Sequence, residues 1–164
     1  MPDKFAHCTF CGARFTPGQR WPRRCAACGE TSYLNPKPVA VVLQPVSLQP
    51  AGPGLLVVRG GAAPARDRPA LPGGYIGVGE TWQEGAVREL AAETGLRASP
   101  TAVRLFDASS SPDGTLLIFG LLPPVAPVPW FTGGESAGCE VIEKPIELAF
   151  ELHTRATERW FATR

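Results

Sequence analysis

Glu89 and Glu93 stand four residues apart in a run of good helix formers. Residues four apart lie side by side on a helix, so the two carboxylates share one face. They repel each other unless a cation binds between them, and carboxylate oxygens suit Mg2+ or Mn2+. Glu80 can join from the preceding loop, while Gly73 and Gly74 let backbone carbonyls approach the same ion. The spacing predicts a divalent-metal site.

The predicted helix has recognisable signals at both ends. Thr81 and Glu84 have the spacing of a capping box, in which each side chain bonds the other residue's backbone N–H. Gly95 suits the left-handed conformation that commonly follows the last turn of a helix. We therefore expect a helix between Thr81 and Gly95. The plainer interpretation is an ordinary capped helix with solvent-exposed glutamates.

A second candidate metal site lies near the N-terminus. Cys8 and Cys11 form one CxxC pair, and Cys25 and Cys28 form another. Each pair is followed by glycine, which allows the tight turn that brings two thiolates to one ion. Four thiolates make a closed tetrahedral site that suits structural Zn2+. The alternative is a chance set of cysteines in a reduced protein. Cys139, the fifth cysteine, is interpreted as a small buried side chain.

Composition limits the classes of function. The chain has 164 residues with a net charge of +1, which gives no general electrostatic case for nucleic acid or anionic membrane. It lacks an apolar run long enough to span a bilayer and an apolar N-terminal signal, so we expect a cytoplasmic protein without membrane contact. In that reducing compartment the cysteines favour metal over disulfides.

The charge pattern and the prolines divide the chain into two modules. Residues 1–34 carry five basic and two acidic residues, and hold four of the five cysteines. The segment Asn35-Pro36-Lys37-Pro38 marks the boundary. We expect a zinc ribbon over 1–34 and a larger globular domain over 35–164. The ribbon is too short to bury a core of its own, so metal would supply much of its folding energy.

The larger module alternates between strand and helix patterns. Strands are predicted over 39–43, 55–59, 103–107, 116–122 and 140–142. The first two are expected to form a hairpin, and Asp113-Gly114 marks the turn of a second hairpin. A closing helix is predicted over 153–161, with His153 as a cap or surface residue. Trp130 and Phe131, in a Pro-rich loop, could stack on a nucleobase or pack on the core.

The stretch from Gly74 to Leu96 resembles the signature of the Nudix hydrolases, G-x5-E-x7-R-E-U-x-E-E-x-G-U, where U is aliphatic. Every fixed position matches except Ala92, which stands where the family has glutamate. A four-cysteine ribbon joined through an Asn-Pro segment to this box resembles the subgroup that includes NADH and flavin dinucleotide pyrophosphatases. The resemblance implies an α/β fold, an α/β/α sandwich with a central mixed sheet, preceded by the ribbon.

The resemblance also implies a reaction, the metal-dependent hydrolysis of a pyrophosphate bond in a nucleoside diphosphate linked to another moiety. Glu89 and Glu93 would ligate Mg2+ or Mn2+ with the Gly73 carbonyl. Glu80 would ligate through water or position the nucleophile, and Arg88 would hold the carboxylates in place. The general base is left open, with Glu135 as a candidate.

The departure at Ala92 removes one carboxylate, so a second or third ion should bind more weakly. The alternative function is therefore a catalytically weak or inactive Nudix-fold protein that binds a nucleotide, with the ribbon contacting nucleic acid or protein. A dinucleotide such as FAD or NAD(H), ADP-ribose, a nucleotide sugar and a nucleoside triphosphate all remain open as substrates. The sequence lacks the Ser-Gln-Pro-Trp-Pro-Phe-Pro motif of NADH pyrophosphatases. Many relatives are dimers, so the resemblance is compatible with a homodimer.

Overall fold

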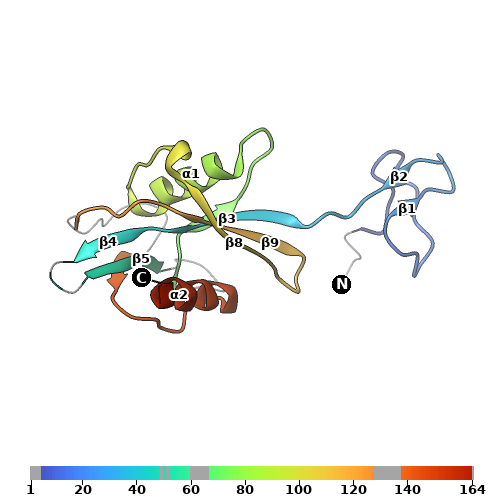
Figure 1. Cartoon of the computed structure of the whole chain (residues 1–164). Coiled ribbons are helices and arrows are strands. Elements are labelled where there is room, and N and C mark those ends of the chain that lie inside the picture. Colours follow the sequence, from blue (N-terminus) through green and yellow to red (C-terminus); the bar gives the residue numbers. More distant parts are fainter. Residues whose placement is uncertain (1–4, 49, 51, 60–66, 128–137, 164) are drawn as a thin grey trace. The chain divides into compact units, whose positions relative to one another are not determined.

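The computed structural model describes residues 5–48, 50, 52–59, 67–127 and 138–163. The chain divides into two compact units, Met1–Pro36 and Lys37–Arg164 (Figure 1). Trp130, Phe131 and Glu135, which were singled out in the sequence, lie outside the described residues.

The first unit is small and built around its cysteines. Strands β1 (Arg23–Arg24) and β2 (Thr31–Ser32) pair antiparallel. Cys8, Cys25 and Phe15 are its buried apolar side chains, and Trp21 packs against them. The guanidinium of Arg23 lies 4.4 Å from the centre of the Trp21 ring, a distance typical of a cation–π contact.

The second unit contains two four-stranded sheets. The first has the order β7-β3-β9-β8, with parallel pairing between β3 and β9 and antiparallel pairing elsewhere. The second has the order β10-β5-β4, with β6 also paired to β5, and all its pairs are antiparallel. The strand bounds are β3 Lys37–Leu43, β4 Pro45–Leu48, β5 Gly52–Arg59, β6 Pro69–Ala70, β7 Gly73–Tyr75, β8 Arg104–Ser110, β9 Thr115–Leu121 and β10 Gly138–Ile142.

Two helices cover opposite faces of the sheet strands, as Figure 1 shows. Helix α1 (Trp82–Thr94) packs Ala86 and Leu90 into the same apolar cluster as Ala40 and Val42 of β3. Helix α2 (Glu151–Thr163) packs in a second cluster that contains the intervening β3 residues, Val41 and Leu43. Because side chains alternate along a strand, β3 is buried on both faces. A short 3-10 helix, η1 (Pro100–Ala102), follows α1. The mixed sheet with helices on both sides confirms the predicted fold class.

The predicted pairing of 103–107 with 116–122 is confirmed as the β8–β9 hairpin. The predicted hairpin between 39–43 and 55–59 is wrong, because β3 pairs with β7 and β9 whereas β5 pairs with β4. The chain changes sheets at Gln44, whose buried amide donates to the carbonyl oxygens of Pro45 and Pro123. A continuous β-branched run is typical of a central strand in a parallel pair, and this signal outweighed short-range pairing.

The closing helix is confirmed and runs from Glu151 to Thr163. The prediction that His153 is a cap or surface residue is wrong, because it is only 6% exposed. It shares a buried helical face with Ala156, Thr157 and Trp160, and this three-to-four-residue spacing places all four toward the sheet. No helix among the described residues is long and apolar enough to cross a membrane.

Candidate active site

Helix α1 begins and ends as its sequence predicts. The Thr81 hydroxyl accepts a hydrogen bond from the Glu84 N–H, and the Glu84 carboxylate accepts one from the Thr81 N–H, at 3.2 Å and 2.7 Å. Gly95 is left-handed at φ 74° and donates its N–H to the Ala91 carbonyl oxygen. A capping interaction of this kind contributes about 1 kcal/mol. Both ends of the helix are therefore fixed, and so is the direction of its acidic face.

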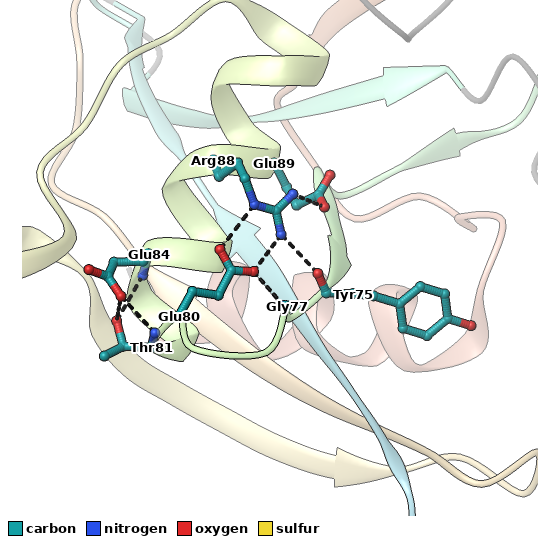
Figure 2. A network of polar contacts seen from close by, with 7 residues as sticks. All are labelled: Tyr75, Gly77, Glu80, Thr81, Glu84, Arg88 and Glu89. Carbon is teal, nitrogen blue, oxygen red and sulfur yellow. Dashed lines mark hydrogen bonds and ion pairs between the residues drawn. The ribbon is translucent and has the colours of Figure 1, made fainter.

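Arg88 joins the loop before the helix to the helix itself (Figure 2). Its guanidinium donates to both carboxylate oxygens of Glu80, at 2.6 Å and 3.1 Å, and to Glu89 Oε1 at 2.5 Å. It also donates to the Tyr75 carbonyl oxygen of β7 at 2.9 Å. The Arg88 guanidinium thus connects two carboxylates and strand β7.

Glu80 is held in its charged form. It accepts hydrogen bonds from Arg88 and from the Gly77 N–H, the latter at 2.5 Å. These donors lower the pKa of Glu80 to about 2, and Arg88 makes the largest contribution. The two carboxylates in turn raise the pKa of Arg88. Glu80 and Arg88 therefore form an ion pair that keeps both charges at any pH near neutral.

Strand β7 lies directly against the other end of this network. A Cβ atom at Gly74 would lie 2.4 Å from the Glu89 carboxyl carbon, so any other residue there requires the Glu89 side chain to shift. The Glu89 side chain is 15% exposed beneath the strand. The neighbouring Gly73 N–H donates to Glu93 Oε2 at 3.0 Å. The glycines therefore bring backbone and carboxylates together, as the sequence indicates, although Gly73 contacts Glu93 through its N–H.

The structure places Glu80, Glu89 and Glu93 around one junction of β7 and α1, but it does not gather them into a tight cluster. Among the described residues, only the four cysteines form a group of three or more possible ligand residues with all donor atoms close together. Arg88 lies between Glu80 and Glu89 and neutralises charge there. Ala92 is half-buried on the same helix.

The cysteine cluster is tightly assembled. The four Sγ atoms lie within 4.8 Å of one another, with 3.8 Å between Cys8 and Cys28 and 3.7 Å between Cys11 and Cys25. Zn–S bonds of about 2.3 Å place the sulfurs of a tetrahedral site about 3.8 Å apart. Backbone N–H groups of Cys11 and Phe10 lower the pKa of Cys8 to about 6, which favours the thiolate. The donor set and spacing therefore fit zinc.

A cavity of about 720 Å3 lies on the α2 side of the β3 and β9 strands, within the size range of small-molecule sites. We name it the α2 cavity. Val39, Val41 and Leu117 line it with Gly73 and Tyr75 of β7. The start of α2 and the β8–β9 turn supply further lining residues, which include His153, Phe150, Glu151, Arg155 and Asp113.

Sequence reasoning missed this cavity and the role of His153 in lining it. The buried spacing of 153, 156, 157 and 160 was a signal that could have placed His153 inside. Strand β7 joins the cavity to the acidic junction. Gly73 and Tyr75 line the cavity, while their backbones bond Glu93 and Arg88.

Comparison with known proteins identifies the family to which this fold belongs. The family model of the NUDIX domain matches residues 36–143. A Nudix hydrolase from Nitrosomonas europaea is 24% identical, with a TM-score of 0.75 over 96% of this chain and 91% of that chain. A C. elegans Ap4A hydrolase is 14% identical, with a TM-score of 0.61 over 76% of this chain and 96% of that chain.

A third similar structure is the NUDIX domain of Shewanella oneidensis NrtR, complexed with ADP ribose. It is 13% identical, with a TM-score of 0.56 over 66% of this chain and 73% of that chain. No curated protein sequence matches this chain significantly. The family model covers more than half of the chain, and the similar structures share its fold. The chain therefore belongs to the Nudix family of pyrophosphohydrolases.

Proposed function

We propose that the larger unit hydrolyses the pyrophosphate bond of a nucleoside diphosphate linked to another moiety, with Mg2+ or Mn2+. The observation that carries this proposal is the junction of β7 and α1, where Arg88 and backbone N–H groups hold three carboxylates. Proposed substrates are a dinucleotide such as FAD or NAD(H), ADP-ribose, or a nucleotide sugar. The NrtR domain bound to ADP ribose supports this class.

Glu89, Glu93 and the Gly73 carbonyl are the proposed metal ligands. The donor chemistry fits Mg2+, because carboxylate oxygens are the ligands that this ion prefers and both Glu89 and Glu93 lie at the junction. A metal in that position would neutralise phosphate charge and lower the pKa of bound water. Arg88 and Glu80 act as positioning residues, since they hold Glu89 and the loop against β7.

We also propose that the four cysteines bind structural Zn2+. A closed shell of four thiolates leaves no open position for substrate, so the ion would stabilise the first unit without joining the reaction. A reducing compartment such as the cytoplasm would keep these thiols available. We further infer domains at 1–34 and 35–164, close to the break between the two compact units. Dimerisation is a separate proposal that a measurement of mass in solution would test.

Two observations favour the alternative of a weak or inactive nucleotide-binding protein. Ala92 supplies no carboxylate, and the glutamates are not gathered as tightly as the cysteines in the described residues. An inactive protein would still bind a nucleotide. The two functions therefore differ in turnover rather than in binding.

A substrate panel tests the proposed hydrolysis. Phosphate-linked products are measured from NADH, NAD, FAD, ADP-ribose, nucleotide sugars and nucleoside triphosphates, with Mg2+ and with Mn2+. We expect turnover of one class, reduced at least about a hundredfold in Glu89→Gln. Glu84→Gln is the matched control, because Glu84 lies on the same helix and only caps it. Turnover that survives in Glu89→Gln would refute its assignment, and no turnover of any compound would favour the binding protein.

A further inference from the structure

The first unit exposes arginines that no described carboxylate neutralises. Glu30 is the only acidic side chain among its described residues, and four arginines accompany it. Arg23 has a structural role, because its guanidinium packs on Trp21 and donates to two backbone carbonyl oxygens. Arg14 and Arg24 are exposed, and neither forms an ion pair with a described residue. The first unit is therefore locally basic, although the whole chain is nearly neutral.

Arg14 and Arg24 line one cavity of about 460 Å3, which we name the arginine cavity. The Arg24 Nε–H donates to the Gly29 carbonyl oxygen at 3.1 Å, which anchors this side chain beside the second CxxC turn. The other lining residues are uncharged, namely Phe15, Thr16, Pro17, Gly18, Gln19 and Ala26. Two guanidinium groups without a carboxylate in the lining suit an anion, and the planar guanidinium is well matched to phosphate.

A plainer interpretation is that the arginines only offset the charge of the four thiolates. The hydrogen bonds of the sulfurs argue against it. The Phe10 N–H donates to Cys8 Sγ at 3.5 Å, whereas no arginine side chain hydrogen-bonds a cysteine sulfur among the described residues. The arginines of the arginine cavity are therefore available to a ligand.

Two aromatic rings of the first unit are largely exposed. The Thr9 and Ser32 hydroxyls are hydrogen-bonded at 3.1 Å, so the first CxxC turn lies against strand β2. The next residue in each segment is an exposed aromatic, Phe10 at 62% and Tyr33 at 68%, whereas Phe15 in the core of the unit is only 6% exposed. Phe10 and Tyr33 thus present apolar ring surface to a ligand.

The strand pairing places Tyr33 on the same face as Arg24. Arg24 pairs with Thr31, so their side chains lie on one face of the β1–β2 ribbon. Tyr33 is two residues beyond Thr31 and continues that face, because side chains alternate and the intervening Ser32 is buried. Arg24 also lines the arginine cavity, so the cavity and the Tyr33 ring border one surface.

We propose that this surface binds single-stranded nucleic acid, with a backbone phosphate in the arginine cavity and unpaired bases stacked on Tyr33 and Phe10. Guanidinium contacts with phosphate supply affinity, and stacking on aromatic rings selects strands whose bases are free. An acidic peptide would match the arginines, but it has no flat ring for each anionic group, as a nucleic acid strand has. The inference goes beyond the proposed function and does not rest on it.

Binding to labelled strands tests the proposal on the zinc-loaded full chain, with no other divalent metal added. The probes are a fluorescein-labelled oligouridylate, an abasic strand with the same number of phosphates, and a glutamate-rich peptide of equal charge. Fluorescence anisotropy gives each dissociation constant at several salt concentrations. We expect the oligouridylate to bind about tenfold more tightly than the abasic strand, because only the oligouridylate can stack bases on the aromatic rings.

Variants separate stacking from charge. Tyr33→Ala should weaken oligouridylate binding about tenfold, whereas Tyr33→Phe keeps the ring and should keep the affinity. Arg14→Gln should weaken both strands severalfold and lower the slope of log affinity against log salt by about 0.7. Arg97→Gln replaces an exposed arginine of the larger unit and should change neither quantity. The zinc content of each variant checks that the first unit is intact.

Backbone amide NMR of the unsubstituted protein locates the bound strand, so the test does not depend on any variant folding. Oligouridylate should shift the amide signals of Arg14, Arg24 and Tyr33. Shifts confined to the larger unit would overturn the proposal, as would equal affinity for the oligouridylate and the abasic strand. No binding, or tighter binding of the glutamate-rich peptide, would overturn it in favour of a protein partner. None of these readouts uses turnover, so failure here is distinct from failure of the proposed hydrolysis.

Discussion

The cysteine cluster and the acidic junction are both candidate metal sites, but they are built in different ways. All four cysteine ligands come from two short turns, and their sulfurs lie as close together as a bound ion requires. The junction draws on β7, a loop and α1, and Arg88 neutralises part of its charge. A closed structural site can thus be assembled from residues that are close in the sequence. An open site such as the junction depends on the fold and on Arg88 as an internal counterion.

The largest effect is expected when one ligand of the cysteine site is removed. Cys25→Ser should release zinc and unfold the first unit, because this short segment has few buried apolar side chains of its own. Zinc content by mass spectrometry and the backbone NMR spectrum measure the loss. Cys139→Ser, outside the cluster, is the control and should keep one zinc per chain. Full zinc content in Cys25→Ser would contradict the four-cysteine site.

The next largest effect is expected when the counterion of the junction, Arg88, is replaced. Arg88→Gln should lower turnover about tenfold to a hundredfold, because Glu80 and Glu89 lose their shared donor. The pKa of Glu80 should rise from about 2 toward its ordinary value. A carboxyl group with a lowered pKa stabilises the folded state at pH values above its unfolded pKa, and this stabilisation is lost as the pH falls toward 2. The variant should therefore lose less stability than the wild type when the pH is lowered over that range.

Arg97→Gln serves as the control for that change, since Arg97 is an exposed arginine beyond the end of α1. Unfolding is followed by denaturant titration at several pH values. An Arg88→Gln protein with wild-type turnover and wild-type acid sensitivity would show that the network has no positioning role.

A smaller effect tests the approach of β7 to Glu89. In Gly74→Ala the new methyl group would meet the Glu89 carboxylate, which is the end of a side chain and can move. We expect turnover to fall about tenfold while the melting temperature changes by only a few degrees. Equal turnover with equal metal affinity would indicate that Glu89 need not lie under the strand.

The smallest expected effect is a gain. Ala92→Glu restores the carboxylate of the family pattern and should raise Mn2+ affinity severalfold at the junction. Zinc content should not change, because the cysteine ligands are unaffected. If neither metal affinity nor turnover rises, a ligand from elsewhere in the chain fills that role.

Local signals in the sequence predicted local structure well. Thr81, Glu84 and Gly95 identified the ends of α1, and the CxxC spacing identified the cysteine cluster, because each interaction spans a few residues. Pairing between distant segments was harder to predict. Strand β3 pairs with β9, far along the chain, so the expected β3–β5 hairpin was wrong.

The α2 cavity illustrates why part of the site could not be predicted. Its walls come from β3, β7, β9 and the start of α2, and no spacing within one segment describes that assembly. The glutamates were identified by their spacing, but the partners of Arg88 on β7 and in the loop became visible only in the folded chain.

Mn2+ binding followed by electron paramagnetic resonance tests the central claim most directly, with zinc already bound to the cysteines. Wild type and Glu84→Gln should bind Mn2+ alike, whereas Glu89→Gln and Glu93→Gln should each bind at least about tenfold more weakly. Equal Mn2+ affinity in all four proteins would contradict a divalent-metal site at the junction of β7 and α1.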